Sequence, residues 1–137
     1  MATAKKTSSK TKSSSKPATK AKPKSATATR GLNILHDPVL NRGTAFTVEQ
    51  RQAAGVEGLL PVGVDTLELQ MARVHTQLDM LESDLQCYLY LMDLQSRNQT
   101  LFYAVIMSDP ARFMPLVYTP TVGEACQKYD HIFRASR

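Results

Sequence analysis

The stretch TLELQMARVHTQLDML, from Thr66 to Leu81, decides the fold class of this chain. Asp65 or Thr66 can cap a helix that begins here, because short oxygen-bearing side chains accept bonds from the first free backbone amides. The large apolar residues then recur at spacings of four and three, which places them along one side of an α-helix: Leu67, Met71, Val74, Leu78 and Leu81. The stretch therefore predicts a helix that packs one face into a helical core.

Similar signals lie before this helix. Thr47 and Gln50 have the spacing of a capping box, and Gly55 supplies a terminator, which predicts a short helix of about two turns. Residues 31–46 carry Pro, Asn and Gly and read as an ordered but irregular lead-in, and residues 58–63 read as a loop.

Two further helices follow. One begins at Ser83 with Gln86, and its predicted apolar face consists of Leu85, Tyr88, Leu89, Leu91 and Met92. The next runs from about Arg97 to Met107 and presents Leu101, Phe102, Val105 and Ile106. Strand-like alternation is absent apart from three residues before Thr119, so we expect a mainly α fold of four or five helices.

The segment MPLVYTPTVGEAC, Met114 to Cys126, contains two prolines. A proline restricts the residue before it to extended geometry, so we expect Met114 and Thr119 to be non-helical and residues 116–118 to be extended. Thr121 and Glu124 then have capping-box spacing, which predicts a helix over residues 122–133. This arrangement would leave the phenol of Tyr118 exposed at a turn. A tyrosine in such a place is more often a half-buried packing residue than a catalyst.

Four ordered segments carry a resemblance to a known family. They are LNRGTAFT (Leu40–Thr47), GLLP (Gly58–Pro61), RNQTLFY (Arg97–Tyr103) and MPLVYTPTVGEACQKY (Met114–Tyr129), and together they cover about three quarters of the chain. The chain resembles the N-terminal domain of malic enzymes. The resemblance implies a compact helical domain over residues 31–137, and it places Tyr118 where the family has a tyrosine that supplies an acid group to the active site.

Malic enzymes oxidise malate with NAD or NADP and decarboxylate the product to pyruvate and CO2, with Mg²⁺ or Mn²⁺. The resemblance implies this reaction for a full-length protein, with Tyr118 as the general acid. We find no glycine-rich dinucleotide loop and no metal-ligand spacing in the sequence, and Lys128 matches no catalytic lysine. We therefore expect an incomplete piece of a malic enzyme that is inactive alone. The alternative is a non-catalytic dimerisation or regulatory module.

The resemblance also implies a possible regulatory site. Some malic enzymes bind the activator fumarate at a dimer interface through one Gln and two Arg, and the matching residues here are Gln70, Arg73 and Arg97. Two arginine forks suit a small dicarboxylate. The competing interpretation makes Gln70 and Arg73 solvated helix residues and Arg97 a structural contact. Because this domain contributes to the family's dimer contact, we expect a homo-oligomer.

The first 30 residues differ in composition from the rest of the chain. They hold eight Lys and one Arg with no acidic residue, and too few apolar side chains to offset the entropy of ordering. We predict a disordered tail at residues 1–30. The rest of the chain contains eight basic and all twelve acidic residues, so the net charge of +5 comes from this tail. It could be a solvated extension, make weak salt-dependent nucleic-acid contacts, or be a mitochondrial transit peptide.

We rank a cytoplasmic location above a mitochondrial one, because the tail is rich in Lys rather than Arg and lacks large apolar residues. No apolar run approaches the length of a membrane span. Cys87 and Cys126 are expected to be buried free thiols. The three histidines are scattered without metal-ligand spacing, so no metal site is predicted.

Overall fold

The computed structural model describes residues 29–133, and the predicted basic tail therefore lies almost entirely outside the described residues. The described part contains eight α-helices, one 3₁₀ turn and no strand. The helices are α1 (Leu32–His36), α2 (Val48–Ala54), α3 (Leu67–Asp79), α4 (Asp84–Arg97), α5 (Gln99–Ser108), α6 (Pro110–Val117), α7 (Thr121–Gln127) and α8 (Tyr129–Ile132), with the 3₁₀ turn η1 (Gly43–Ala45) between α1 and α2. The mainly α prediction is confirmed, but the expected number of four or five helices is too low. Helix α1 and the turn η1 lie within residues 31–46, which were predicted to be irregular.

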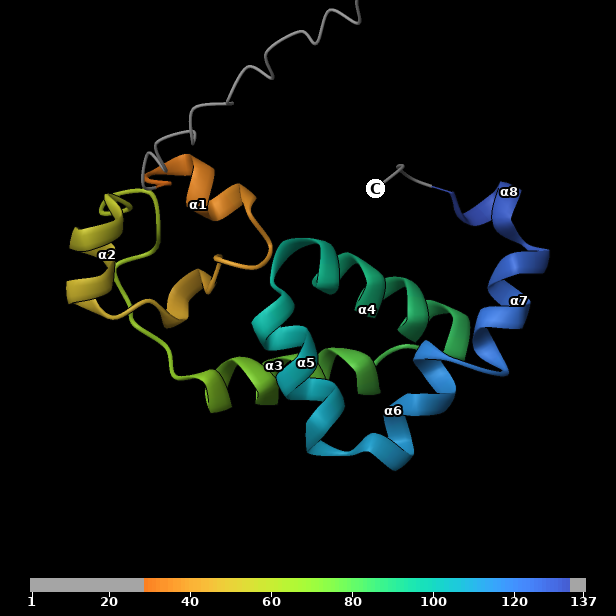
Figure 1. Ribbon diagram of the computed structural model, residues 1–137. Helices are drawn as coiled ribbons and strands as arrows, with labels where there is room; N and C mark the ends of the chain where they lie inside the picture. Colours follow the sequence, from red (N-terminus) through yellow and green to blue (C-terminus); the bar gives the residue numbers. More distant parts are fainter. Residues whose placement is uncertain (1–28, 134–137) are drawn as a thin grey trace, which may run out of the picture.

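The helices form three groups along the molecule (Figure 1). The helices α3, α4 and α5 occupy the middle, α1 and α2 lie at one end, and α6 to α8 lie at the other. Contacts of α4 with α5, α6 and α7, together with contacts between α3 and α5, connect the middle to the end that carries α6 to α8. None of the helices within residues 29–133 is long and apolar enough to cross a membrane.

The predicted ends of the first helices are confirmed. Thr47 and Gln50 form a reciprocal capping box on α2, and Gly55 closes the helix in the left-handed conformation with φ 67°. Thr66, rather than Asp65, caps α3 by accepting a bond from the amide of Leu69 at 3.2 Å. The side chain of Asp65 is thereby available for contacts elsewhere.

The hydrophobic core lies between α3, α4, α5 and α6. It contains the predicted residues of α3 and α5, and adds residues of α4 and α6: Val74, Leu78, Leu91, Leu94, Leu101, Phe102, Val105, Ile106, Phe113 and Leu116. Leu67, Met71 and Leu81 pack against its edge, as the spacing on α3 predicted. Apolar burial in this cluster is the main force that holds the helices together.

The predicted apolar face of α4 was wrong in its centre. Leu91 and Leu94 are buried, whereas Leu85, Tyr88 and Leu89 are only half-buried. Helix α4 contacts α5, α6 and α7, so several of its sides carry apolar residues and the sequence pattern does not single out the most buried one.

The extended piece predicted before Tyr118 is also wrong. Met114 and residues 116–117 belong to α6, which contains Pro115 in its interior. Proline removes a single amide donor from this two-turn helix, and the burial of Phe113 and Leu116 in the core offsets that loss. Thr119 lies in the following turn, so its prediction as non-helical is confirmed.

The helix predicted over residues 122–133 is divided at Lys128, where φ is −107° and ψ is 20°. Its predicted capping box is absent, because Thr121 is already the first residue of α7 and no side chain caps that end. The side chain of Thr121 is instead buried. Cys126 is exposed, contrary to the prediction, while Cys87 is half-buried and burial raises the pKa of its thiol. Both cysteines are free.

Candidate functional site

Tyr118 lies at the corner between α6 and α7. Its amide donates to the carbonyl of Met114 at 2.9 Å, and its carbonyl accepts from the amide of Val122 at 2.9 Å. These bonds fix its backbone to the helix on either side. The side chain is 64% exposed, so the phenol is presented at the surface, as predicted.

The residues around this corner explain its position. Phe113 and Leu116 are buried on α6, and Ala125 is buried on α7, so each helix is anchored within two turns of Tyr118. A hydroxyl held in this way can donate a proton to a molecule bound outside this surface. Tyr118 does not line either of the two pockets described below.

Gln70, Arg73 and Arg97 meet at one pocket of about 630 Å³. Gln70 and Arg73 come from α3, while Arg97 is the last residue of α4. Apolar and aromatic side chains complete the lining: Val74, Met80, Leu81, Tyr90, Leu94 and Leu101, with Gln77 beside them. The three polar residues selected from the sequence therefore line the same pocket in the fold.

Tyr90 gives this pocket a second polar feature. Its hydroxyl donates a short hydrogen bond to Oε1 of Gln77, and burial raises the pKa of the phenol. Tyr90 therefore stays protonated and its hydroxyl is occupied within the pocket wall. Tyr90 was not among the residues predicted for the apolar face of this helix, and its hydrogen bond depends on Gln77 of α3, which only the fold brings beside it.

Gln70 is a buried part of the wall, not a solvated helix residue. It is 6% exposed, and its Nε2 donates to the carbonyl of Arg42 at 3.1 Å and to Oγ1 of Thr44 at 3.0 Å. These bonds attach α3 to the segment around η1. Gln70 and Arg97 also line an adjoining pocket of about 530 Å³ on the side of that segment.

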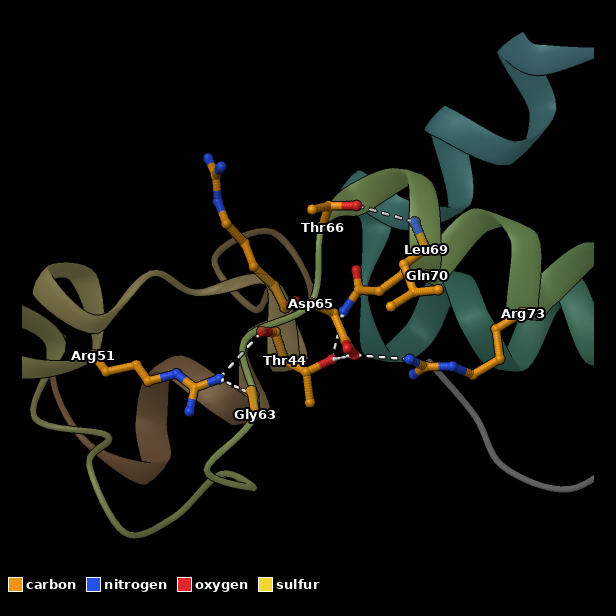
Figure 2. A network of polar contacts seen from close by, with 9 residues as sticks. Thr44, Arg51, Gly63, Asp65, Thr66, Leu69, Gln70 and Arg73 are labelled. Atoms are coloured by element: carbon orange, nitrogen blue, oxygen red, sulfur yellow. Dashed lines mark hydrogen bonds and ion pairs between the residues drawn. The ribbon is translucent and has the colours of Figure 1, made fainter.

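Arg73 is held by Asp65, with 2.9 Å between Nη2 and Oδ2. The same carboxylate oxygen accepts from Oγ1 of Thr44 at 2.5 Å, and Figure 2 shows Asp65 between these two partners. The hydroxyl of Thr44 and the guanidinium of Arg73 lower the pKa of Asp65. Thr44 therefore connects Gln70 and Arg73 through a chain of directed hydrogen bonds.

Arg97 has a different kind of partner. Its Nε and Nη2 both donate to Oδ2 of Asp93, at 3.0 and 2.6 Å, one helical turn earlier on α4. Asp93 is not part of either pocket lining. This pair was readable from the sequence, because an acid and an arginine four residues apart on a helix face the same way.

Arg51 is the main polar residue that the sequence did not reveal. Its guanidinium is buried and donates to five backbone carbonyls, those of Thr44, Phe46, Pro61, Val62 and Gly63. Figure 2 shows the guanidinium of Arg51 between the two backbone segments that carry Thr44 and Gly63. Arg51 thereby joins the segment around η1 to the loop that leads into Asp65.

No group of three or more His, Cys, Asp or Glu side chains between residues 29 and 133 could hold a metal ion. The sequence contains no glycine-rich phosphate loop.

Comparison with known proteins gives the class to which these features belong. Residues 95–137, which include Arg97 and Tyr118, match the family described as malic enzyme, N-terminal domain. An NADP-dependent malic enzyme of Mus musculus is 51% identical over 111 residues, which are 81% of this chain and 19% of the relative. The NADP-dependent malic enzyme of Homo sapiens is 50% identical over the same shares. A hydrogenosomal malic enzyme of Neocallimastix frontalis is 44% identical over 111 residues, again 81% of this chain and 19% of the relative.

These matches define an N-terminal domain of the malic enzyme type, as the sequence segments had indicated. The chain belongs to the malic enzyme family. It spans about a fifth of the length of the curated relatives it matches.

Proposed function

We propose that this chain supplies the substrate-side helical domain of a malic enzyme. The complete enzyme would oxidise malate with NAD or NADP and release pyruvate and CO2. The observation that carries this proposal is the VYTPTVG segment, in which Tyr118 is exposed at a corner fixed by buried residues on α6 and α7. The identity to NADP-dependent malic enzymes over 81% of the chain supports it.

Tyr118 is the residue to which we assign chemistry. Decarboxylation leaves an enol of pyruvate, whose methylene carbon must gain a proton to give the product. The phenol O–H bond breaks and its proton forms a C–H bond at that carbon, while the enol hydroxyl gives its proton to a base elsewhere in the enzyme. That base, now protonated, returns a proton to the phenolate. The exposure of Tyr118 suits this role, because the hydroxyl must reach a substrate held partly by other residues.

NAD or NADP would accept the hydride in the complete enzyme, and Mg²⁺ or Mn²⁺ would polarise the oxygen of the substrate. No cluster of His, Cys, Asp or Glu that could hold a metal ion occurs among residues 29–133, so we assign no metal ligand to this part of the chain. In this proposal the chain has two roles in the reaction: it forms one wall of the active site and it carries the proton donor.

A chimera tests the proposal. Residues 31–133 of this chain replace the matching segment of the mouse NADP-dependent malic enzyme, and malate-dependent reduction of NAD and NADP is followed with Mg²⁺ or Mn²⁺. We expect an active chimera and no activity from the 137-residue chain alone. A folded but inactive chimera would contradict the domain assignment. Nucleotide- and metal-dependent activity from the chain alone would contradict the incomplete-enzyme interpretation.

A second role, in regulation, is favoured by the pocket that contains Gln70, Arg73 and Arg97. We assign to it a small dicarboxylate such as fumarate, because two guanidinium forks from different helices can each bind one carboxylate. The convergence of the three side chains on one pocket supports this role over the interpretation in which they are unrelated surface residues. Its test is given in the Discussion.

Assembly and location complete the proposal. Exposed apolar residues on α3 and α5, such as Leu69, Tyr103 and Met107, favour a homo-oligomer formed through the helical domain. We retain the cytoplasmic location, with a mitochondrial one as the alternative if residues 1–30 act as a transit peptide. A non-catalytic dimerisation or regulatory module remains the competing function, and an inactive, folded chimera would favour it.

A further inference from the structure

The two arginines of the pocket are neutralised in different ways. The partner of Arg73, Asp65, is fixed from a second direction by Thr44 and has a side chain that is only 19% exposed. The partner of Arg97, Asp93, is 50% exposed, and Arg97 itself is 60% exposed. Arg73 is therefore an anchored cation, and Arg97 is a cation that can exchange its partner.

The contact between Arg97 and Asp93 uses the atoms that a ligand would need. Nε and Nη2 form one edge of the guanidinium fork, which is the edge that binds a carboxylate in a bidentate manner. In the structure both atoms donate to a single oxygen of Asp93. A ligand carboxylate that binds this edge must displace Asp93.

The displacement is energetically feasible. Exposed ion pairs between residues four apart on a helix are weak, because water screens the charges and ordering two side chains costs entropy. Asp93 would also repel a dianion in the pocket, because it leaves one negative charge within a few ångströms of Arg97. Both effects act in the same direction and weaken ligand binding.

We propose that Asp93 is an internal competitor that occupies the carboxylate-binding edge of Arg97 and sets the affinity of the pocket for dicarboxylates. This inference rests on the regulatory pocket proposed above. The ligand keeps Arg73 as a fixed contact and exchanges with Asp93 at Arg97. Asp93 thus raises the ligand concentration at which the pocket fills.

The test is calorimetric titration of sodium fumarate into the 137-residue chain at neutral pH and constant low ionic strength, with the parent and Asp93→Asn compared. Asn keeps the shape of the side chain and removes its charge. We expect Asp93→Asn to lower the Kd for fumarate by roughly two- to five-fold. The Nε–H resonance of Arg97 should move on titration in both proteins, and at lower fumarate concentration in the variant.

The matched control is Glu124→Gln. Glu124 forms an ion pair with Lys128 of the same four-residue spacing, at 2.7 Å, on α7 and away from the pocket lining. This variant changes the net charge equally, and its Kd should equal that of the parent. Fumarate binding that is unchanged or weakened by Asp93→Asn, or tightened equally by Glu124→Gln, would overturn the competitor role while leaving the pocket in place. Absence of binding to both parent and Asp93→Asn would overturn the pocket and the inference together.

Discussion

Thr44 and Asp65, separated by 21 residues in the sequence, are joined by a hydrogen bond of 2.5 Å between Oγ1 and Oδ2. The carboxylate accepts from Thr44 and from Arg73, and Thr44 accepts from Gln70. This arrangement ties the segment around η1 to the first two turns of α3. The pocket-facing residues of α3 thus depend on a segment that lies far from them in the chain.

Thr44→Val should raise the pKa of Asp65 toward its ordinary value, because the hydrogen bond from Thr44 is the largest cause of its lowering. A lowered carboxyl pKa contributes stability above the unfolded-state pKa of about 3.9, and this contribution is lost as the pH falls through the folded-state value. The variant should therefore lose less stability on acidification than the parent does. Carbon-13 titration of the Asp65 carboxyl measures the shift. Thr76→Val, whose hydroxyl bonds within α3, is the control and should leave the Asp65 titration unchanged.

Arg51→Met should destabilise the fold by about 2–4 kcal/mol, because it leaves several partly buried carbonyls without a charged donor. Urea unfolding followed by circular dichroism measures the change. Arg42→Met removes the same charge from an exposed side chain and should stay within about 0.5 kcal/mol of the parent. Equal effects of the two substitutions would show that the carbonyl contacts of Arg51 add nothing to stability.

Leu91→Ala should cost about 2–5 kcal/mol of unfolding free energy, since Leu91 is fully buried between the central helices and its truncation leaves a cavity. Leu69→Ala, on the exposed side of α3, should cost much less. The burial of Leu91 and the exposure of Leu69 predict this order. A smaller loss for Leu91→Ala than for the half-buried Leu85→Ala, measured in the same unfolding experiment, would contradict the central position of Leu91 in the core.

Arg97→Ala should abolish activation by fumarate in the chimeric enzyme and leave unstimulated turnover within a few-fold of the parent. Arg97 lines the pocket and lies outside the α6–α7 corner that carries Tyr118. The readout is initial velocity against fumarate concentration at fixed malate. Activation that survives the substitution would eliminate the pocket as the regulatory site, and a parent chimera without any response to fumarate would leave Gln70, Arg73 and Arg97 as structural residues.

Tyr118→Phe should lower turnover of the chimera by about 10²- to 10⁴-fold, the usual effect of removing a positioned general acid. The ring and its backbone bonds remain, and the side chain is exposed, so folding and malate binding should be retained. Turnover and the protonation of added enolpyruvate are measured separately, and both should fall. Turnover within three-fold of the parent would return Tyr118 to a packing role.

The amino-acid sequence by itself determined the local features of this protein. The apolar spacing from Leu67 to Leu81, the capping box at Thr47 and the terminator at Gly55 act over a few residues, so they were readable without the fold. The VYTPTVG segment likewise indicated the family and the exposed position of Tyr118.

Only the tertiary structure decided the features that depend on distant residues. Pro115 lies in a helix because Phe113 and Leu116 are buried in the core, and Thr121 is buried instead of capping α7. The pocket exists because α3 and the end of α4 meet, and Arg51 is satisfied by carbonyls up to 12 residues away. Local patterns report helix and turn preferences, whereas burial and long-range hydrogen bonds are set by which segments pack together, and these contacts can outweigh a local preference.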